Sequence, residues 1–173
     1  MQNFEKSLEF GKTGESAIAE FLKRRGFNIL PVYEKIDNEN KGPTLFMADG
    51  SSIIAPDMLV FGNGKTIWIE AKHKTAFTWH RITQRWVTGI DRHHYHQYLK
   101  IAEASEWPVW LLFLHKNGSA KDTPPGFQSP TGLFGNEIFK LSKSINHTSR
   151  NWGKNGMVYW WHESLIFLAG AEG

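Results

Sequence analysis

Two carboxylates and one lysine lie close together within residues 53–74, as Asp57, Glu70 and Lys72. Strand-forming residues surround them, and Asn63-Gly64 between the two apolar runs is a strong signal for a two-residue hairpin turn. Because side chains alternate along a strand, Glu70 and Lys72 share one face, about 7 Å apart. The hairpin would bring Asp57 beside them. Burying ionised groups in a sheet is costly unless they are paired or hold a metal ion, so we expect these charges to form one compensated cluster.

Such a cluster suits phosphodiester hydrolysis. This reaction needs charge stabilisation on a phosphoryl oxygen, an activated water and help for the leaving oxygen. Mg²⁺ provides all three when one or two carboxylates hold it and water and phosphate fill its other positions. Asp57 and Glu70 would be those carboxylates, and the backbone carbonyl of Ala71 a further oxygen ligand. Lys72 would orient the attacking water or help to deprotonate it.

The segment from residue 4 to residue 25 has the periodicity of an amphipathic helix. Five residues recur on one face at steps of three and four: Leu8, Gly11, Glu15, Ile18 and Leu22. Glu15 is thus a carboxylate within an apolar stripe, and it could add a metal ligand through a bound water or a second ion. Alternatively, Glu15 lies at a solvated edge of the apolar stripe or in a frayed first turn, because Gly11 and Gly14 disfavour helix. Gly26 is expected to end the helix.

Together with this helix, the remaining residues up to 115 predict the element order αβββαβ. Residues 27–33 are typical of a strand that Pro31 places at an edge or a bulge. Residues 34–50 predict a loop with a short strand at 45–47, and the structure of residues 75–91 is left open. Asp91 is expected to cap a helix that continues to about Ala104. The apolar run 109–114 is typical of a buried strand parallel to its neighbour.

Composition favours one domain, with a core at about residues 4–115 and a β-rich C-terminal extension at about 116–173. In the extension we expect a strand at 137–141 and a bent strand or a hairpin at 157–168. The net charge of +3 is compatible with a nucleic-acid partner. The chain has no cysteine, which excludes disulfides, thiolate metal sites and a cysteine nucleophile. It has no secretory signal and no apolar run near the roughly 20 residues that cross a bilayer, so we expect a cytoplasmic protein without membrane contact.

Pro56-Asp57 followed by Glu70-Ala71-Lys72 resembles the PD-(D/E)XK nuclease pattern, in particular the archaeal Holliday-junction resolvase group. In that group, too, an acidic residue near the start of the first helix is followed by Gly-Phe at its end, as Glu15 is by Gly26-Phe27. The hydrophobic hairpin with its Asn-Gly turn is also similar. The resemblance covers about residues 14–74.

The resemblance implies a restriction-endonuclease-like α/β fold, in which helices flank a central mixed sheet. It also implies Mg²⁺-dependent cleavage of DNA, for which Mn²⁺ could substitute, and a homodimer. The metal ligands would be Asp57, Glu70 and the Ala71 carbonyl, with Lys72 as the catalytic lysine. The resemblance further implies Glu15 as the acid on the first helix, and Gln97 as the residue on the next helix that contacts the site.

The sequence departs from this group in its longer loop at residues 34–52 and throughout the part after Lys74. The substrate therefore stays open between branched DNA, ordinary duplex and RNA. An alternative function is a catalytically inactive nucleic-acid-binding or assembly subunit on the same fold. For the residues themselves, the alternative for Asp57 is a turn residue after Pro56, and for Glu70 and Lys72 it is a cross-strand ion pair on an exposed face.

A second group of residues combines cations with flat rings, which suits phosphate contacts and base stacking. The candidate DNA-binding residues are Trp79, Arg81, Arg85 and Arg92. The alternative is a loop that packs two tryptophans onto the core. His93 and His96 have helical spacing, but a structural zinc site needs four ligands, so a solvated helix face is favoured.

Overall fold

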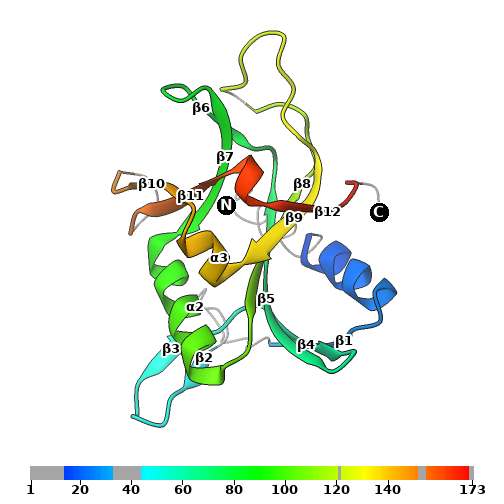
Figure 1. The fold of residues 1–173 in the computed structure, drawn as a ribbon, viewed down its shortest axis with the longest axis vertical. Helices are drawn as coiled ribbons and strands as arrows, with labels where there is room; N and C mark the ends of the chain where they lie inside the picture. The colour runs from blue at the N-terminus through cyan, green and yellow to red at the C-terminus, as the bar shows by residue number, and fades with distance from the viewer. Residues whose placement is uncertain (1–13, 33–43, 121, 152–154, 172–173) are drawn as a thin grey trace, which may run out of the picture.

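The computed structural model describes residues 14–32, 44–120, 122–151 and 155–171. A first helix covers residues 14–24. The elements that follow, shown in Figure 1, are β1 (Asn28–Pro31), β2 (Thr44–Phe46), β3 (Ser52–Ile54), β4 (Met58–Gly62), β5 (Lys65–Lys74), β6 (Thr78–His80), β7 (Arg85–Asp91), α2 (Arg92–Ser105), β8 (Val109–His115), β9 (Gly132–Glu137), α3 (Ile138–Ser142), β10 (Ile145–Ser149), β11 (Met157–Trp161), the 3-10 turn η1 (His162–Ser164) and β12 (Ile166–Ala169).

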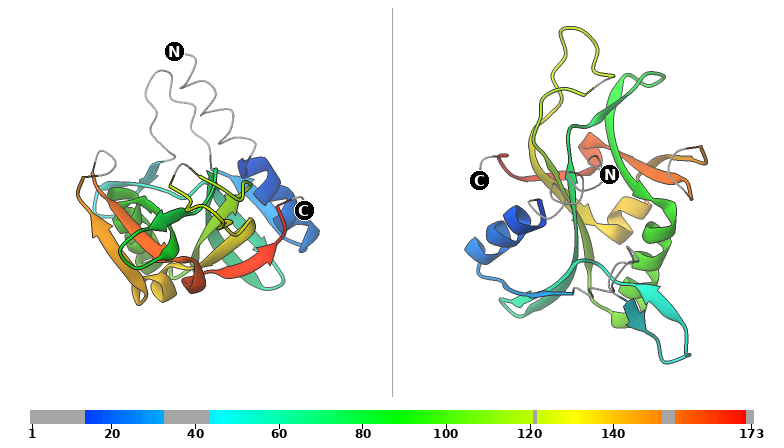
Figure 2. Two further views of the ribbon diagram at one scale, coloured as in Figure 1. Left: turned by 90° about the horizontal axis from the view of Figure 1, so that it is seen from above. Right: turned by 180° about the vertical axis from the view of Figure 1, so that it is seen from behind.

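A six-stranded sheet in the order β1-β4-β5-β8-β9-β12 forms the centre of the fold. β5 and β8 run parallel, and the other neighbours are antiparallel. The first helix and α2 lie on opposite sides of this sheet (Figures 1 and 2). The predicted α/β fold, with a central mixed sheet flanked by helices, is confirmed.

Local signals account for the elements around the hairpin. Asn63 and Gly64 have φ angles of +51° and +71°, so both adopt the left-handed region that a two-residue hairpin turn requires. Gly26, with φ +84°, ends the first helix. Asp91 caps α2, because its Oδ1 accepts a hydrogen bond of 2.7 Å from the His93 N–H.

A second sheet, in the order β10-β11-β7-β6, contains the segment whose structure the sequence left open. Residues 75–91 supply β6 and β7, and β7 pairs with β11 from the C-terminal part of the chain. The C-terminal part also contributes β9 and β12 to the central sheet. Residues 157–168 thus enter two different sheets, with η1 between β11 and β12.

The prediction of a strand at residues 137–141 is wrong, because most of this range forms the short helix α3. Glu137 explains the difference: its carboxylate accepts hydrogen bonds from the N–H groups of Phe139 and Lys140 and caps the helix. β9 ends at the same residue. The short strand expected at residues 45–47 is confirmed as β2. Of the preceding loop, residues 34–43 lie outside the described residues, as do Leu8 and Gly11 of the first helix.

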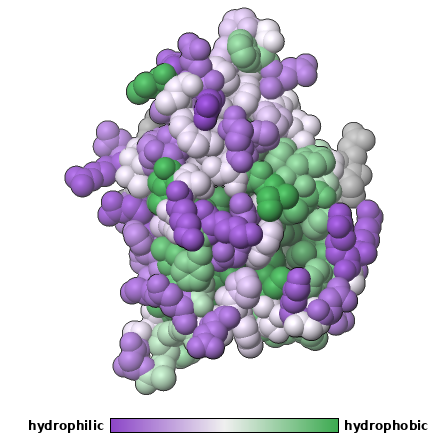
Figure 3. Space-filling view, in the orientation of Figure 1, coloured by the Kyte–Doolittle hydropathy of each residue, from purple (hydrophilic) through white to green (hydrophobic). Residues whose placement is uncertain are grey.

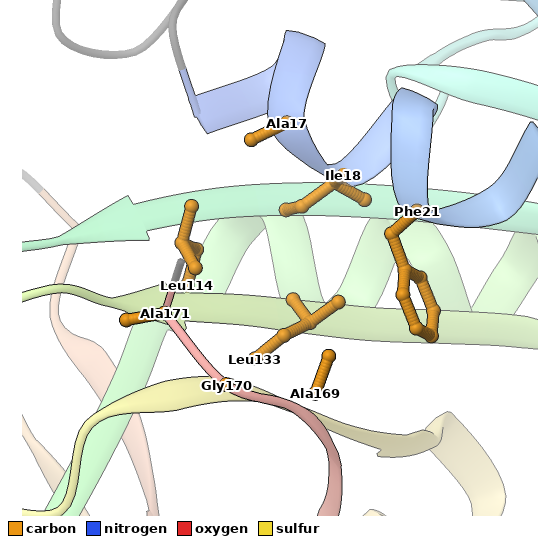
Figure 4. A pocket seen from close by; sticks show the side chains of 8 residues that line it. All are labelled: Ala17, Ile18, Phe21, Leu114, Leu133, Ala169, Gly170 and Ala171. Carbon is orange, nitrogen blue, oxygen red and sulfur yellow. The ribbon is translucent and has the colours of Figure 1, made fainter. Parts of the chain in front are cut away.

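Apolar packing holds the layers together on both faces of the central sheet. On one face Ile18 and Leu22 of the first helix pack against strand residues such as Val60 and Ile69. Nearby, Figure 4 shows Ile18 and Phe21 of the first helix facing Leu114 and Leu133. They line a small apolar cavity of about 20 Å³, which is a packing gap and too small for a substrate. On the other face lies the larger core. Its buried Trp160 donates a hydrogen bond of 2.9 Å from its ring N–H to the Leu141 carbonyl. None of the helices in the described part of the chain is long and apolar enough to cross a membrane.

Candidate active site

The pairing of β4 with β5 brings the two predicted carboxylates together. Met58 is the partner of Ile69, and one further step of this register places Asp57 opposite Glu70. Asp57 Oδ2 accepts a hydrogen bond of 2.8 Å from the Ala71 N–H. The carboxyl group of Asp57 is therefore held against β5 at the residue between Glu70 and Lys72.

Glu70 and Lys72 form a partly enclosed ion pair on the α2 side of the sheet. The Lys72 ammonium contacts Glu70 Oε1, and Glu70 is only 1% exposed. Their partners on β8 are the buried residues Leu111 and Phe113. The two charges thus share one strand above an apolar core, which differs from an exposed cross-strand pair.

The electrostatics of the cluster set one ammonium group against two carboxyl groups. Burial and the neighbouring Glu70 raise the pKa of Asp57 to about 8, although Lys72 and the Ala71 N–H act in the opposite direction. Burial lowers the pKa of Lys72, but the charges of Glu70 and Asp57 outweigh it and hold this pKa above its ordinary value. One ammonium therefore faces two buried carboxyl groups, and it does not compensate both.

Glu15 lies where its charge reaches the cluster from the first helix, as its place in the apolar stripe predicted. Its charge raises the pKa of both Asp57 and Lys72. Gly14 explains how the helix comes so close, because a Cβ at this residue would lie 2.3 Å from the Cβ of His73 on β5. Gly14 disfavours the helix by its intrinsic propensity, but it permits the close approach of helix and strand.

The helix α2 supplies two further neighbours that the sequence did not single out. Burial raises the pKa of Tyr98 well above its usual range, and the negative charge of Glu70 adds to this. His94, one turn earlier, has its pKa lowered by burial and by the Lys72 charge. Gln97 was the candidate on this helix, and its Oε1 accepts a hydrogen bond of 3.2 Å from the Ile54 N–H. It therefore ties α2 to β3, just before Asp57. The signal for Tyr98 was its place one helical turn after His94 on the buried side of the helix.

The predicted DNA-binding residues lie on or beside the second sheet. Trp79 packs against Trp86 at 4.8 Å between ring centroids, and Trp86 in turn packs against the core. Arg81 pairs with Asp122 at 3.1 Å. Arg85 lies over the Trp161 ring, and Arg92 is the first residue of α2.

The residues at the cluster fit a hard divalent cation. Two adjacent carboxyl groups with one counter-charge leave room for further positive charge, and the carbonyl of Ala71 is on the same strand. Across the described ranges, no set of three or more His, Asp or Glu side chains could share one ion. A zinc site at His93 and His96 thus has no support. The pattern instead matches Mg²⁺, which one or two carboxylates bind while water and phosphate complete its coordination.

Comparisons with known proteins show a likeness in fold. No protein-family model matches the chain, and no curated protein matches its sequence. Among solved structures, the Holliday junction resolvase Hjc of the archaeal hyperthermophile Archaeoglobus fulgidus is similar, with a TM-score of 0.51 and 9% sequence identity. The match covers 89% of this chain and 90% of that chain, so the likeness extends well beyond residues 14–74. At this identity it shows the fold alone.

Proposed function

We propose that the chain is a Mg²⁺-dependent deoxyribonuclease that hydrolyses phosphodiester bonds, with Mn²⁺ able to replace Mg²⁺. The observation that carries the proposal is the meeting of Asp57 and Glu70 on paired strands, with Lys72 beside them. The fold likeness to a Holliday junction resolvase supports it and makes a structure-specific endonuclease the first activity to examine.

Each residue of the cluster has a role in this proposal. Asp57, Glu70 and the Ala71 carbonyl would hold the cation, which when bound supplies charge stabilisation and a more acidic water. Lys72 is kept charged by its acidic neighbours, so it suits orienting the water and stabilising charge on the phosphate better than accepting a proton. Glu15 would contribute through a bound water.

The proton on Asp57 couples this site to pH. Because the pKa of Asp57 is raised to about 8, its carboxyl group is largely protonated at neutral pH before a cation binds. A ligand carboxyl group must lose its proton to bind a metal ion. Affinity for Mg²⁺ should therefore increase as the pH rises toward 8.

Cleavage of supercoiled plasmid and of a four-way DNA junction in Mg²⁺ tests the proposal. We expect Asp57→Asn, Glu70→Gln and Lys72→Met each to lower the cleavage rate about 100-fold or more. Glu20→Gln is the matched control, because Glu20 is an exposed carboxylate on the first helix that pairs only with Lys23 among the interactions described. Undiminished cutting by Glu70→Ala and Lys72→Ala would eliminate this site.

The alternative of an inactive binding or assembly subunit has a separate test. Calorimetric titration of the wild-type chain with Mg²⁺ or Mn²⁺ should give saturable heat that Glu70→Ala abolishes. Absence of such heat, together with absence of cleavage, would favour the inactive subunit.

We also propose a homodimer that uses the edge strand β12. Phe167 is 59% exposed and Ile166 45% exposed on this strand. Figure 3 shows a hydrophobic patch over β12 and the neighbouring edge of the central sheet. An unpaired apolar edge strand favours association with a second chain. Sedimentation equilibrium should give twice the monomer mass for the wild type, and the monomer mass for Phe167→Lys.

A further inference from the structure

One face of the second sheet is turned away from the core and carries flat rings and cations. The registers place His80 opposite Arg85, Val87 opposite Trp161, and Tyr159 opposite His147. Side chains of paired residues lie on the same face, and so do residues two apart along a strand. We define this ring face by five residues: His80, Arg85, His147, Tyr159 and Trp161. The other face of the same strands belongs to the core, with Ile90, Val158 and Trp160.

The rings of this face form a stacked column. The centroids of His80 and His147 are 4.6 Å apart with 25° between the planes, and those of His147 and Tyr159 are 4.6 Å apart with 13°. Gly89 provides the space beneath, because a Cβ there would lie 2.8 Å from the Tyr159 ring. Burial, and after it the charge of His80, lower the pKa of His147. His80, His147 and Tyr159 all line a depression on the surface, so the ring surfaces that are not stacked within the column can meet a ligand.

Cations border the column. The Arg85 guanidinium lies 5.3 Å from the Trp161 ring centroid. The face opens into a depression of about 1120 Å³ between β6 and its following turn on one side and β10 on the other. Arg81 and Arg150 line this depression. Asp122, which pairs with Arg81, is the acidic residue among those that line it. This volume is near the upper end of the roughly 300–1,000 Å³ range of ligand pockets, so it has room for a nucleotide or more.

The strand β7 connects this depression to the candidate active site. Val87 lines the depression, and β7 continues for four residues, about 13 Å, to Asp91 at the start of α2. One turn into α2, His94 is within electrostatic reach of Lys72 and Glu70. A polymer bound on the ring face could therefore continue along β7 toward the carboxylates.

We propose that the ring face binds unpaired nucleotides of the DNA substrate, by stacking bases on its rings and pairing phosphates with its arginines. Aromatic side chains in a cationic groove are the general means of holding single strands, because every base has a π-face. Bases within a duplex are stacked on each other and do not offer these faces. The inference rests on the proposed nuclease function and makes its substrate a DNA with a single-stranded segment near the cleaved bond.

Fluorescence anisotropy with a labelled oligothymidine, measured in EDTA so that no cleavage occurs, tests the ring face. We expect Tyr159→Leu to weaken binding about tenfold or more, and Arg85→Gln severalfold. Tyr159→Phe keeps the ring and should bind like the wild type. Arg24→Gln removes an exposed cation at the end of the first helix and serves as the control for charge. Affinity for a blunt duplex of the same length should change little in all four variants.

Photo-cross-linking gives a readout that does not depend on a folded variant. An oligonucleotide with 5-iodouracil, irradiated with the full wild-type chain, should cross-link to peptides that contain Tyr159, Trp161 or His147. Cross-links confined to other peptides, or equal oligothymidine affinity of the folded Tyr159→Leu and Arg85→Gln variants, would overturn the inference.

The two proposals fail in different ways. Glu70→Ala should lose cleavage and keep oligothymidine binding. Binding at the ring face by a wild-type chain that cuts no DNA would refute the nuclease alone. If the chain cuts DNA but replacing Tyr159 or Arg85 leaves its affinity for single strands unchanged, the ring-face proposal alone is refuted.

Discussion

At the scale of single residues, the neighbours of Glu70 determine what the site can do. Glu70 is buried, Lys72 pairs with it, and Tyr98 is close enough for the Glu70 charge to raise the pKa of Tyr98. A ligand carboxylate needs such support, because residues that orient metal ligands typically change affinity or activity 10- to 100-fold when they are replaced. Tyr98 is therefore a positioning residue for the proposed metal site.

Tyr98→Phe removes the hydroxyl beside Glu70 and keeps the ring. We expect about tenfold lower cleavage and a higher Mg²⁺ concentration for half-maximal rate. Tyr95→Phe is the matched control, because Tyr95 is also buried on α2 but packs against Trp160. A Mg²⁺ titration that is the same for Tyr98→Phe and the wild type would contradict this role.

His115 links stability to pH away from the site. It is fully buried and stacks on Phe77 at 3.7 Å, and burial, with the Lys74 charge, lowers its pKa to about 3. The unfolded chain binds a proton at His115 below about pH 6.5, whereas the folded chain does so only near pH 3. Its contribution to stability is therefore present above pH 6.5 and is lost as the pH falls toward 3.

His115→Phe should remove this dependence. The difference in unfolding free energy between wild type and variant should be constant above pH 7. Below pH 6.5 the wild type should lose stability relative to the variant, by up to about 1.4 kcal/mol per pH unit. The difference is the useful quantity, because the raised pKa of Asp57 acts with the opposite sign in the wild-type curve. Denaturant unfolding from pH 5 to 8 measures it, and a pH-independent difference would contradict the assignment.

At the scale of elements, the distance between the first helix and β5 controls where Glu15 lies. Gly14→Ala should favour the helix by about 1 kcal/mol through propensity. The added Cβ would meet His73 at 2.3 Å, however, and such overpacking costs about 1–3 kcal/mol. We therefore expect net destabilisation, together with reduced cleavage as Glu15 moves away. Gly50→Ala is a spatial control, because nothing lies within 4 Å of a Cβ there, although its positive φ adds some strain. A Gly14→Ala protein that is more stable than the wild type would contradict this account.

At the scale of the whole molecule, the C-terminal part completes both sheets. Without residues 116–173, the central strand β8 would lose its partner β9, and β7 would lose β11. The core would also lose Trp160 and Leu141. We predict that a chain ending at His115 does not fold cooperatively, as measured by circular dichroism and denaturant titration. A sigmoidal transition for this fragment would show that residues 4–115 form a core on their own.

The sequence alone determined the features that depend on neighbours along the chain. The Asn-Gly hairpin aligns Asp57 with Glu70 because strand alternation and turn type are local properties, and the Asp91 cap and the apolar run of β8 are likewise local. Only the tertiary structure decided the pairing of β7 with β11, the approach of Tyr98 to Glu70 and the ring face. These depend on contacts between residues far apart in the chain, whose arrangement arises from packing of the whole core and is not encoded in either segment alone. The short helix after Glu137 differs from expectation for a related reason: a capping carboxylate outweighed an apolar pattern that suits strand and helix equally.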